Sequence, residues 1–199
     1  MARAEDIKTG LVRIAFAQFL HELQDRKNDS GQVTGQNYGC TLLIPKTDTA
    51  TLSMMEQNII DACVAENWGD EAKVKKMIAD GLIKLPVLDG DGRQGLNKTT
   101  GERHQGFAGH FFLRVTSGAQ FPPVVLDVHA QPIASKDPKR LKSGDYGYAG
   151  IAAYTWNNDK QGKGVTFGIG VFQKIKDGES LGGSGGPDLS KFKAETVDT

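Results

Sequence analysis

Two glycine-rich apolar runs, YGYAGIAAYTW (residues 146–156) and VTFGIGVFQK (residues 165–174), indicate the fold. Apolar side chains recur at every second position in both runs, which is the period of a β-strand. Glycine inside such a run is typical of a bent or bulged strand. We therefore predict that these residues form two bent strands, joined by a turn at residues 157–164.

The preceding sequence contains further strand-like runs and one change of period. Strands are predicted at residues 11–19, 38–44, 107–116 and 124–128. Apolar residues at helical spacing predict a helix over residues 48–67, and a shorter helix follows over residues 70–80. The polar segments 24–37 and 89–106 are predicted loops. The second is long enough to be a mobile loop that closes over a ligand.

This order of elements predicts a mainly β fold with a helical insertion after the second strand. An OB-like β-barrel fits that order. An immunoglobulin-type sandwich fits less well, because its turns would recur at short intervals without a helical insertion. We predict one domain over residues 1–181, followed by a flexible Gly-rich linker and a weakly acidic tail over residues 182–199.

Composition excludes some classes of protein and leaves others open. The formal net charge is zero, so overall charge does not predict a nucleic-acid partner. The two cysteines, Cys40 and Cys63, lie among apolar neighbours and are expected to be buried free thiols of a reducing cytoplasm. No apolar run approaches the ~18 residues of a membrane span, and the polar start does not resemble a signal peptide.

The predicted strand at 107–116 places an aromatic ring among polar residues. Alternation puts Phe112 on the same face as His110 and Arg114, opposite Leu113 and Val115. An exposed ring can stack on a base while a neighbouring arginine reaches the phosphates. The alternative is that Phe112 packs under the helices and Arg114 is ordinary surface.

The strand at 146–156 carries four aromatic residues of one parity, with small residues between them. They are Tyr146, Tyr148, Tyr154 and Trp156. Small residues between rings leave a sheet surface open, and such a groove suits stacking on an unpaired strand of nucleic acid. An aromatic core cluster is the alternative interpretation.

Basic residues flank these strands. The segment KDPKRLK (136–142) contributes Lys139, Arg140 and Lys142, and Arg13 lies in the first strand. A basic loop beside an aromatic sheet is the combination that binds single strands without sequence preference. The alternative is a solvated loop with no ligand.

Signals for catalysis are weak. His104, His110, Asp127 and His129 lack the spacing of a metal motif. The run DGDG (89–92) lacks the closing glutamate of a calcium loop and is interpreted as a turn. No nucleophile elbow or P-loop occurs. We predict no catalytic residue, no metal and no cofactor.

Seven segments, taken together and in order, resemble a family of phage single-stranded-DNA-binding proteins with an OB-fold. The segments are YGCTLLIPK (38–46), DACVAENWG (61–69), LPVLDGD (85–91), GHFFLRVTS (109–117), PPVVLD (122–127), SGDYGYAGIAAYTW (143–156) and GVTFGIGVFQKIKDGESLGG (164–183). The resemblance implies an OB-like barrel that binds single-stranded DNA during phage replication or recombination, in the cytoplasm of the infected bacterial host. It carries no residue-level map, so the site rests on the alternation argument.

The predicted function is therefore sequence-independent binding of single-stranded DNA. The predicted DNA-binding residues are Arg13, His110, Phe112, Arg114, Lys139, Arg140, Lys142, Tyr148, Tyr154 and Trp156. Replication or recombination proteins would be recruited by the tail, no membrane is involved, and a homo-oligomer is compatible with the sequence. One alternative is a phage structural or assembly protein without DNA affinity that self-associates through β edges. Another is a metal-dependent enzyme that uses His110, Asp127 and His129.

Overall fold

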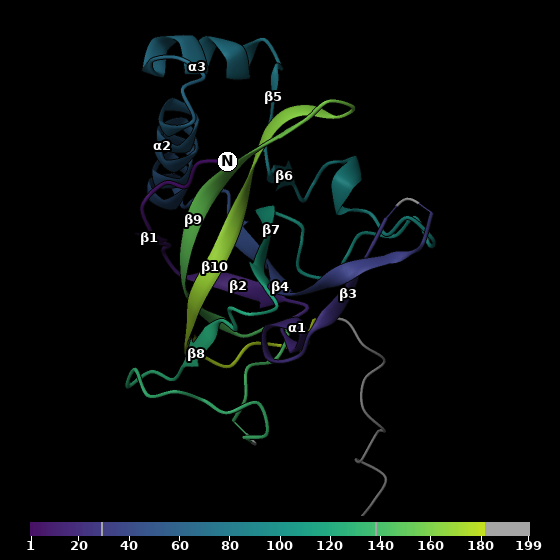
Figure 1. Cartoon of the computed structure of the whole chain (residues 1–199). Helices are drawn as coiled ribbons and strands as arrows, with labels where there is room; N and C mark the ends of the chain where they lie inside the picture. The colour runs from purple at the N-terminus through teal and green to yellow at the C-terminus, as the bar shows by residue number, and fades with distance from the viewer. Residues whose placement is uncertain (29, 138, 182–199) are drawn as a thin grey trace, which may run out of the picture.

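The chain folds around a closed ring of strands in the computed structural model, which describes residues 1–28, 30–137 and 139–181 (Figure 1). Around the ring β9 pairs with β2, β2 with β4, β4 with β7, β7 with β10, and β10 with β9. The β7–β10 pairing is parallel, and the β9–β10 pairing is antiparallel. The ring strands are β2 (Val12–Ala15), β4 (Val33–Pro45), β7 (His110–Gly118), β9 (Tyr146–Asn158) and β10 (Gly162–Lys176).

Short strands extend the ring at its margins. β1 pairs with β9, β3 forms a hairpin with β4, β6 pairs with β7, and both β5 and β8 pair with β10. Their bounds are β1 (Ile7–Lys8), β3 (Gln24–Lys27), β5 (Ile83–Lys84), β6 (Val87–Asp89) and β8 (Val124–Leu126). Bulges interrupt the β9–β10 register after Ile169 and after Lys174, which confirms that the glycine-rich strands are bulged.

Two helices lie at one end of the β9–β10 hairpin (Figure 1). They are α2 (Thr49–Ala65) and α3 (Glu71–Ala79), and they confirm the predicted helical insertion. Asp48 caps α2 by accepting a hydrogen bond from the Thr51 backbone N–H, and Asp70 caps α3 in the same way through Lys73. Two single turns, α1 (Gln18–His21) and η1 (Arg93–Gly95), lie in connecting segments.

The main core fills the ring and continues under α2. Alternate residues of the strands point inward, among them Val12, Leu42, Leu113 and Ile151, and all of these are buried. Asn58 ties α2 to the ring, because its side chain donates to the Glu5 carbonyl and accepts from the Ala153 backbone N–H. Met55 of α2 and Val74 of α3 are buried in this main core, so both helices are part of it.

A second apolar cluster lies outside the ring, on the outer face of β4 and β7. It contains Ala15, Leu43, Phe107, Phe112 and Leu181. The segment between β6 and β7 supplies Phe107, and the chain after β10 supplies Leu181. Both faces of the sheet are therefore covered at this position.

Of the two predicted loops, the first is wrong, whereas the second is an irregular connection as predicted, with only the short turn η1 inside it. Residues 24–37 form the β3–β4 hairpin. Residues 89–106 are not an open loop, because Arg103 donates to the backbone carbonyls of Gly90 and Asp91. The Lys46 ammonium also contacts Asp89 at 2.6 Å and Asp91 at 2.9 Å. Polar composition indicated both loops. It cannot register the backbone pairing that orders the first segment or the side-chain contacts that order the second.

The prediction for the two cysteines is confirmed, and the remaining points concern the membrane and the tail. Cys40 and Cys63 are buried free thiols, and burial raises the pKa of the Cys63 thiol to about 11. No helix in the described part of the chain is long and apolar enough to cross a membrane. The predicted linker and tail at 182–199 lie outside the described residues.

Candidate nucleic-acid interface

A groove of about 370 Å³ runs along the outer face of β4 and β7. These are the second and third strands of the ring in chain order, and they form the face that OB-folds use for oligonucleotides. The β3 hairpin borders the groove on one side (Figure 1). Its floor includes Thr41 and Thr116, and its walls include Phe16, Phe19, Arg26 and Arg114.

Phe16 presents a ring at the edge of this groove. The predicted strand at 11–19 ends early, at Ala15, because Phe16 adopts a positive φ of 57°. This conformation is unfavourable for a bulky residue and tends to persist at functional sites. It turns the ring outward to 44% exposure, edge-on to His104 with centroids 6.3 Å apart.

Phe121 presents a second ring at the far end of β7, with 71% of its surface exposed. The ring lies beside Gly118, where a Cβ would be 3.5 Å from ring atom Cδ2. The turn is held because the Ser117 hydroxyl donates to the Phe121 carbonyl at 2.6 Å. Phe121 therefore adds an aromatic surface to the same face of β7 that carries Arg114.

The two arginines of the groove are free to pair with phosphates. Arg114 points outward from β7 opposite Thr41, and its side chain is exposed. Arg26 projects from the β3 hairpin and is also exposed. Neither guanidinium has a hydrogen-bond or ion-pair partner among the described residues. An unpaired guanidinium beside an exposed ring is suited to bind a phosphate next to a stacked base.

The sequence predicted Arg114 but missed Phe16, Phe121 and Arg26. Strand alternation puts Phe16 on the same face as Val12 and Ile14, which are buried, and a backbone reversal is invisible to that pattern. The sequence does indicate an exposed ring at Phe121, because this residue stands before Pro122–Pro123 in a polar turn and belongs to no apolar pattern.

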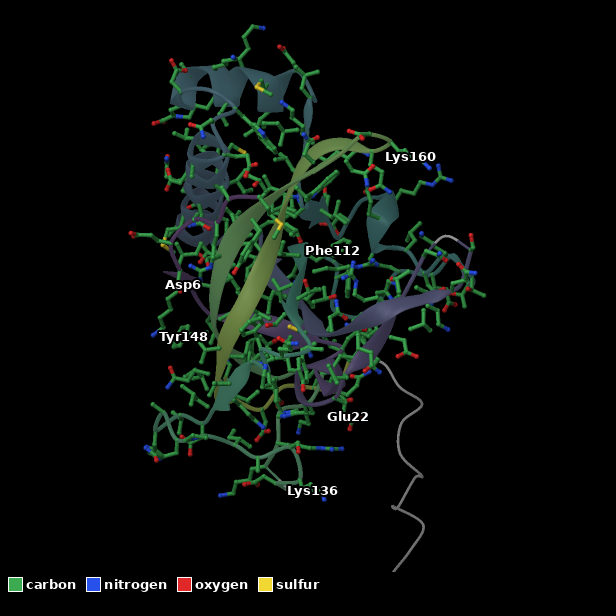
Figure 2. All side chains as sticks on the ribbon, in the orientation of Figure 1. Asp6, Glu22, Phe112, Lys136, Tyr148 and Lys160 are labelled. Atoms are coloured by element: carbon green, nitrogen blue, oxygen red, sulfur yellow. The ribbon has the colours of Figure 1, made fainter. Side chains whose placement is uncertain are left out.

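The prediction that Phe112 is an exposed stacking residue on β7 is wrong. It is only 2% exposed, and its ring lies 4.9 Å from that of Phe107 (Figure 2). Alternation placed Phe112 on the correct outer face, but the second apolar cluster covers that face. A base cannot reach this ring unless the cluster opens.

His110 and Arg13 make contacts inside the protein. The His110 Nδ1 lies 2.7 Å from the Ala108 carbonyl oxygen. Arg13 donates to the carbonyls of Gly144 at 3.0 Å and Glu179 at 2.6 Å. These contacts position neighbouring turns, and both side chains keep partial exposure.

The outer face of β9 carries the predicted aromatic row. Tyr146, Tyr148, Tyr154 and Trp156 are all partly exposed, whereas residues of the other parity, such as Ile151, are buried. Trp156 lies over Gly164 of β10, and Tyr154 lies over Gly168, where a Cβ would be 2.7 Å from the ring. The rings therefore lie along the sheet with one face against β10.

Cations lie over these rings. The Lys8 ammonium is 4.4 Å from the Tyr148 centroid, and the Arg3 guanidinium is 5.6 Å from that of Tyr154. Lys84 lies 6.0 Å from the Trp156 centroid. Contacts of this kind stabilise an exposed ring and supply positive charge, but they also compete with a stacking base.

The aromatic row and the groove lie on different sides of the molecule. β2 separates β9 from β4 around the ring, and β10 separates β9 from β7. Tyr148 accordingly lies on the flank opposite the β3 hairpin (Figure 2). The predicted site residues therefore do not form one surface.

The predicted basic loop lies at the end of the molecule away from α2, where Figure 2 shows Lys136. Lys139, Arg140 and Lys142 line a pocket of about 450 Å³ together with Lys174 and Lys176 of β10. The alternative metal site gains no support, because no group of three or more His, Cys, Asp or Glu among the described residues could hold an ion. The Asp127 carboxylate instead accepts from the backbone of His129 and Gln131.

A closed five-strand ring with an arginine- and phenylalanine-lined groove over its second and third strands defines an oligonucleotide-binding protein of the OB class. The chain belongs to the family described as the single-stranded-DNA-binding protein of Enterobacter phage Enc34, whose family model matches residues 5–199. This membership confirms the predicted family. It also opposes the alternatives of a structural protein and a metal-dependent enzyme.

The chain is also similar to individual phage proteins, in sequence to one and in fold to two others. Protein p50 of Acyrthosiphon pisum secondary endosymbiont phage 1 is 27% identical over 191 residues, covering 94% of this chain and 91% of its own. The fold is similar to that of the Enc34 protein in complex with single-stranded DNA, with a TM-score of 0.60, 17% identity and 89% coverage of both chains. It is also similar to gp2.5, a single-stranded DNA-binding protein of bacteriophage T7, with a TM-score of 0.55, 14% identity and 98% coverage of both chains.

Proposed function

We propose that this chain binds single-stranded DNA without sequence preference, and that the groove over β4 and β7 is the primary binding face. The observation that carries the proposal is the pairing of exposed rings, Phe16 and Phe121, with the unpaired guanidiniums of Arg26 and Arg114 on one face. Rings stack on any base, because every base has a π-face, and arginines pair with any phosphate. Neither contact distinguishes sequence.

The remaining predicted residues have different places in the proposal. Lys139, Arg140 and Lys142 would add phosphate contacts beyond the groove, with Arg13 and His110 at its margin. Tyr148, Tyr154 and Trp156 form a second candidate face, where the cations over the rings supply charge for phosphates although they compete with stacking bases. Phe112 is excluded because it is buried.

The biological setting follows from the family. We propose that the chain coats unpaired DNA during phage replication or recombination in the infected bacterial cell. The tail at 182–199 would recruit replication or recombination proteins, and self-association on DNA would give a homo-oligomer. The first would be measured by pull-down with and without the tail, and the second by light scattering.

The proposal is tested by anisotropy of a labelled oligothymidylate at low and moderate salt, with labelled duplex as the control. Saturable binding that weakens steeply with salt and favours the single strand is expected. The variants Arg114→Gln and Phe16→Gly should each weaken binding, the second by about 1–3 kcal/mol for a lost stack. Glycine accepts the positive φ of residue 16, so Phe16→Gly should fold normally.

A matched control variant separates the loss of a groove residue from the loss of a surface charge elsewhere. Lys75→Gln removes an exposed cation of α3, far from the groove in the fold, where Lys75 pairs with Glu71. It should leave binding unchanged. Folded Arg114→Gln and Phe16→Gly proteins with the affinity of the control variant would remove the groove from the binding face.

A further inference from the structure

The basic pocket at the end of β10 differs from an ordinary patch of surface lysines. Five cations line it, and two carboxylates, Asp127 and Asp177, oppose them. The Asp127 carboxylate is occupied by backbone N–H groups of its own turn. Asp177 is therefore the acidic side chain that faces the cations of this pocket.

Lys174 is the fixed centre of the pocket. Its side chain is only 13% exposed, and its ammonium lies 2.9 Å from the buried carboxylate of Asp145. Asp145 is itself held by the backbone N–H groups of Lys142 and Gly178. Burial acts to lower the pKa of Lys174, but hydrogen bonds from its ammonium to Asp145 and Asp177 outweigh burial and raise it. The pocket therefore has a preorganised charge at its base.

Asp177 lies at the mouth of the pocket. One carboxylate oxygen lies 2.9 Å from the Lys174 ammonium and 3.4 Å from that of Lys142. The side chain is 71% exposed. Because the carboxylate of this pair is exposed to solvent, it exchanges readily, and another anion can replace it on the half-enclosed ammonium. A phosphate oxygen would find the same two ammonium groups.

The pocket adjoins the groove through α1. Phe19 of α1 lines the groove, and the backbone N–H of the nearby Ala17 donates to the Ser143 hydroxyl oxygen at 3.0 Å. Ser143 directly follows Lys142 of the pocket. Burial lowers the pKa of His21 in α1, and the charge of Arg140 lowers it further, so Arg140 lies within electrostatic range of the helix.

We propose that this pocket binds a backbone phosphate of the single strand where it leaves the groove past α1, and that the phosphate displaces Asp177 from Lys142 and Lys174. The proposal rests on the proposed function. It adds a second, separate phosphate site and an acidic side chain that competes with DNA for it. Binding at this site requires a strand long enough to span both places.

The test compares two oligothymidylates, of about 6 and about 16 nucleotides, within the range of site sizes that OB-folds cover. Asp177→Asn should raise affinity for the longer strand about fivefold and leave the shorter one unchanged. Lys139→Gln with Lys142→Gln should weaken binding of the longer strand alone. The double variant should also reduce the salt slope of that strand by about 0.7 for each phosphate that it no longer neutralises.

Asp61→Asn is the matched control, because it removes one exposed charge from α2 and Asp61 contacts only Gln57 among the described residues. Equal effects of Asp177→Asn and Asp61→Asn would reduce the result to net charge and overturn the proposal. Equal effects on both strand lengths would also overturn it. Failure of the wild-type chain to bind either strand would instead overturn the proposed function, and this inference with it.

Discussion

Phe112 and Phe121 have the same side chain in opposite surroundings on the same face of β7. Phe112 is enclosed by Phe107, Leu43 and Leu181, whereas Phe121 lies open beside Gly118. Phe112→Ala should lower the free energy of unfolding by about 3–5 kcal/mol, because it leaves a cavity in a packed cluster. Phe121→Ala should change it by less than about 0.5 kcal/mol.

Urea denaturation of both variants measures this difference, and single-strand affinity should show the reverse order. A Phe112→Ala protein as stable as the wild type would mean that the second cluster is not packed in solution.

Strand alternation predicted which residues share a face with Phe112. It could not predict the cover, because Phe107 lies in irregular chain just before β7 instead of in the strand, and Leu181 comes from the distant segment after β10.

At the scale of elements, packing in the β9–β10 hairpin depends on glycines of β10, because aromatic rings of β9 occupy the space where a side chain would be. A methyl group on Gly164 would collide with the Trp156 indole, whereas one on Gly170 would meet no atom within 4 Å. Gly164→Ala should therefore destabilise the chain by about 1–3 kcal/mol and shift the Trp emission. Gly170→Ala, in the same strand, should do neither. Similar stability of the two variants would contradict the described ring position.

The β6–β7 connection gives a second prediction at this scale. Hydrogen bonds from Lys46 lower the pKa of both Asp89 and Asp91 below the ordinary 3.8. A lowered pKa means that these contacts stabilise the fold above pH 3.8 and that this contribution disappears as pH falls through the lowered values. Lys46→Met should thus be less stable than the wild type at pH 7.

The gap between Lys46→Met and the wild type should narrow progressively in acid below pH 3.8, when thermal unfolding is followed against pH. A gap that is independent of pH would assign the effect of Lys46 to the cation–π contact of its ammonium with the Phe111 ring, whose centroid is 5.0 Å away. The sequence predicted every ring strand and both long helices, because each has a clear period. It missed the β3–β4 hairpin and the order within 89–106, where the contacts are polar and non-local.

At the scale of the whole molecule, closure of the ring decides which candidate residues one DNA strand can touch. The sequence predicted that the β9 aromatics share one face and left open whether that face is core or surface; in the structure it is partly exposed. A list of strands also does not say that β9 and β4 lie on different sides. A strand in the groove contacts Phe16 and Arg114, while Tyr148 and Trp156 lie around the ring. Both faces would be engaged together only by DNA that wraps the molecule.

Tryptophan fluorescence distinguishes DNA bound in the groove from DNA bound along β9. Trp156 lies in the β9 aromatic row, and neither Trp68 nor Trp156 lines the groove. If the groove is the primary face, a strand of about 6 nucleotides should saturate the anisotropy signal with little change in Trp emission. A Trp68→Phe variant isolates the signal of Trp156. Strong quenching of Trp156 at the same midpoint as the anisotropy change would move the primary face to β9. Quenching that develops only with strands of about 16 nucleotides would show that DNA fills the groove first and then wraps onto the aromatic row.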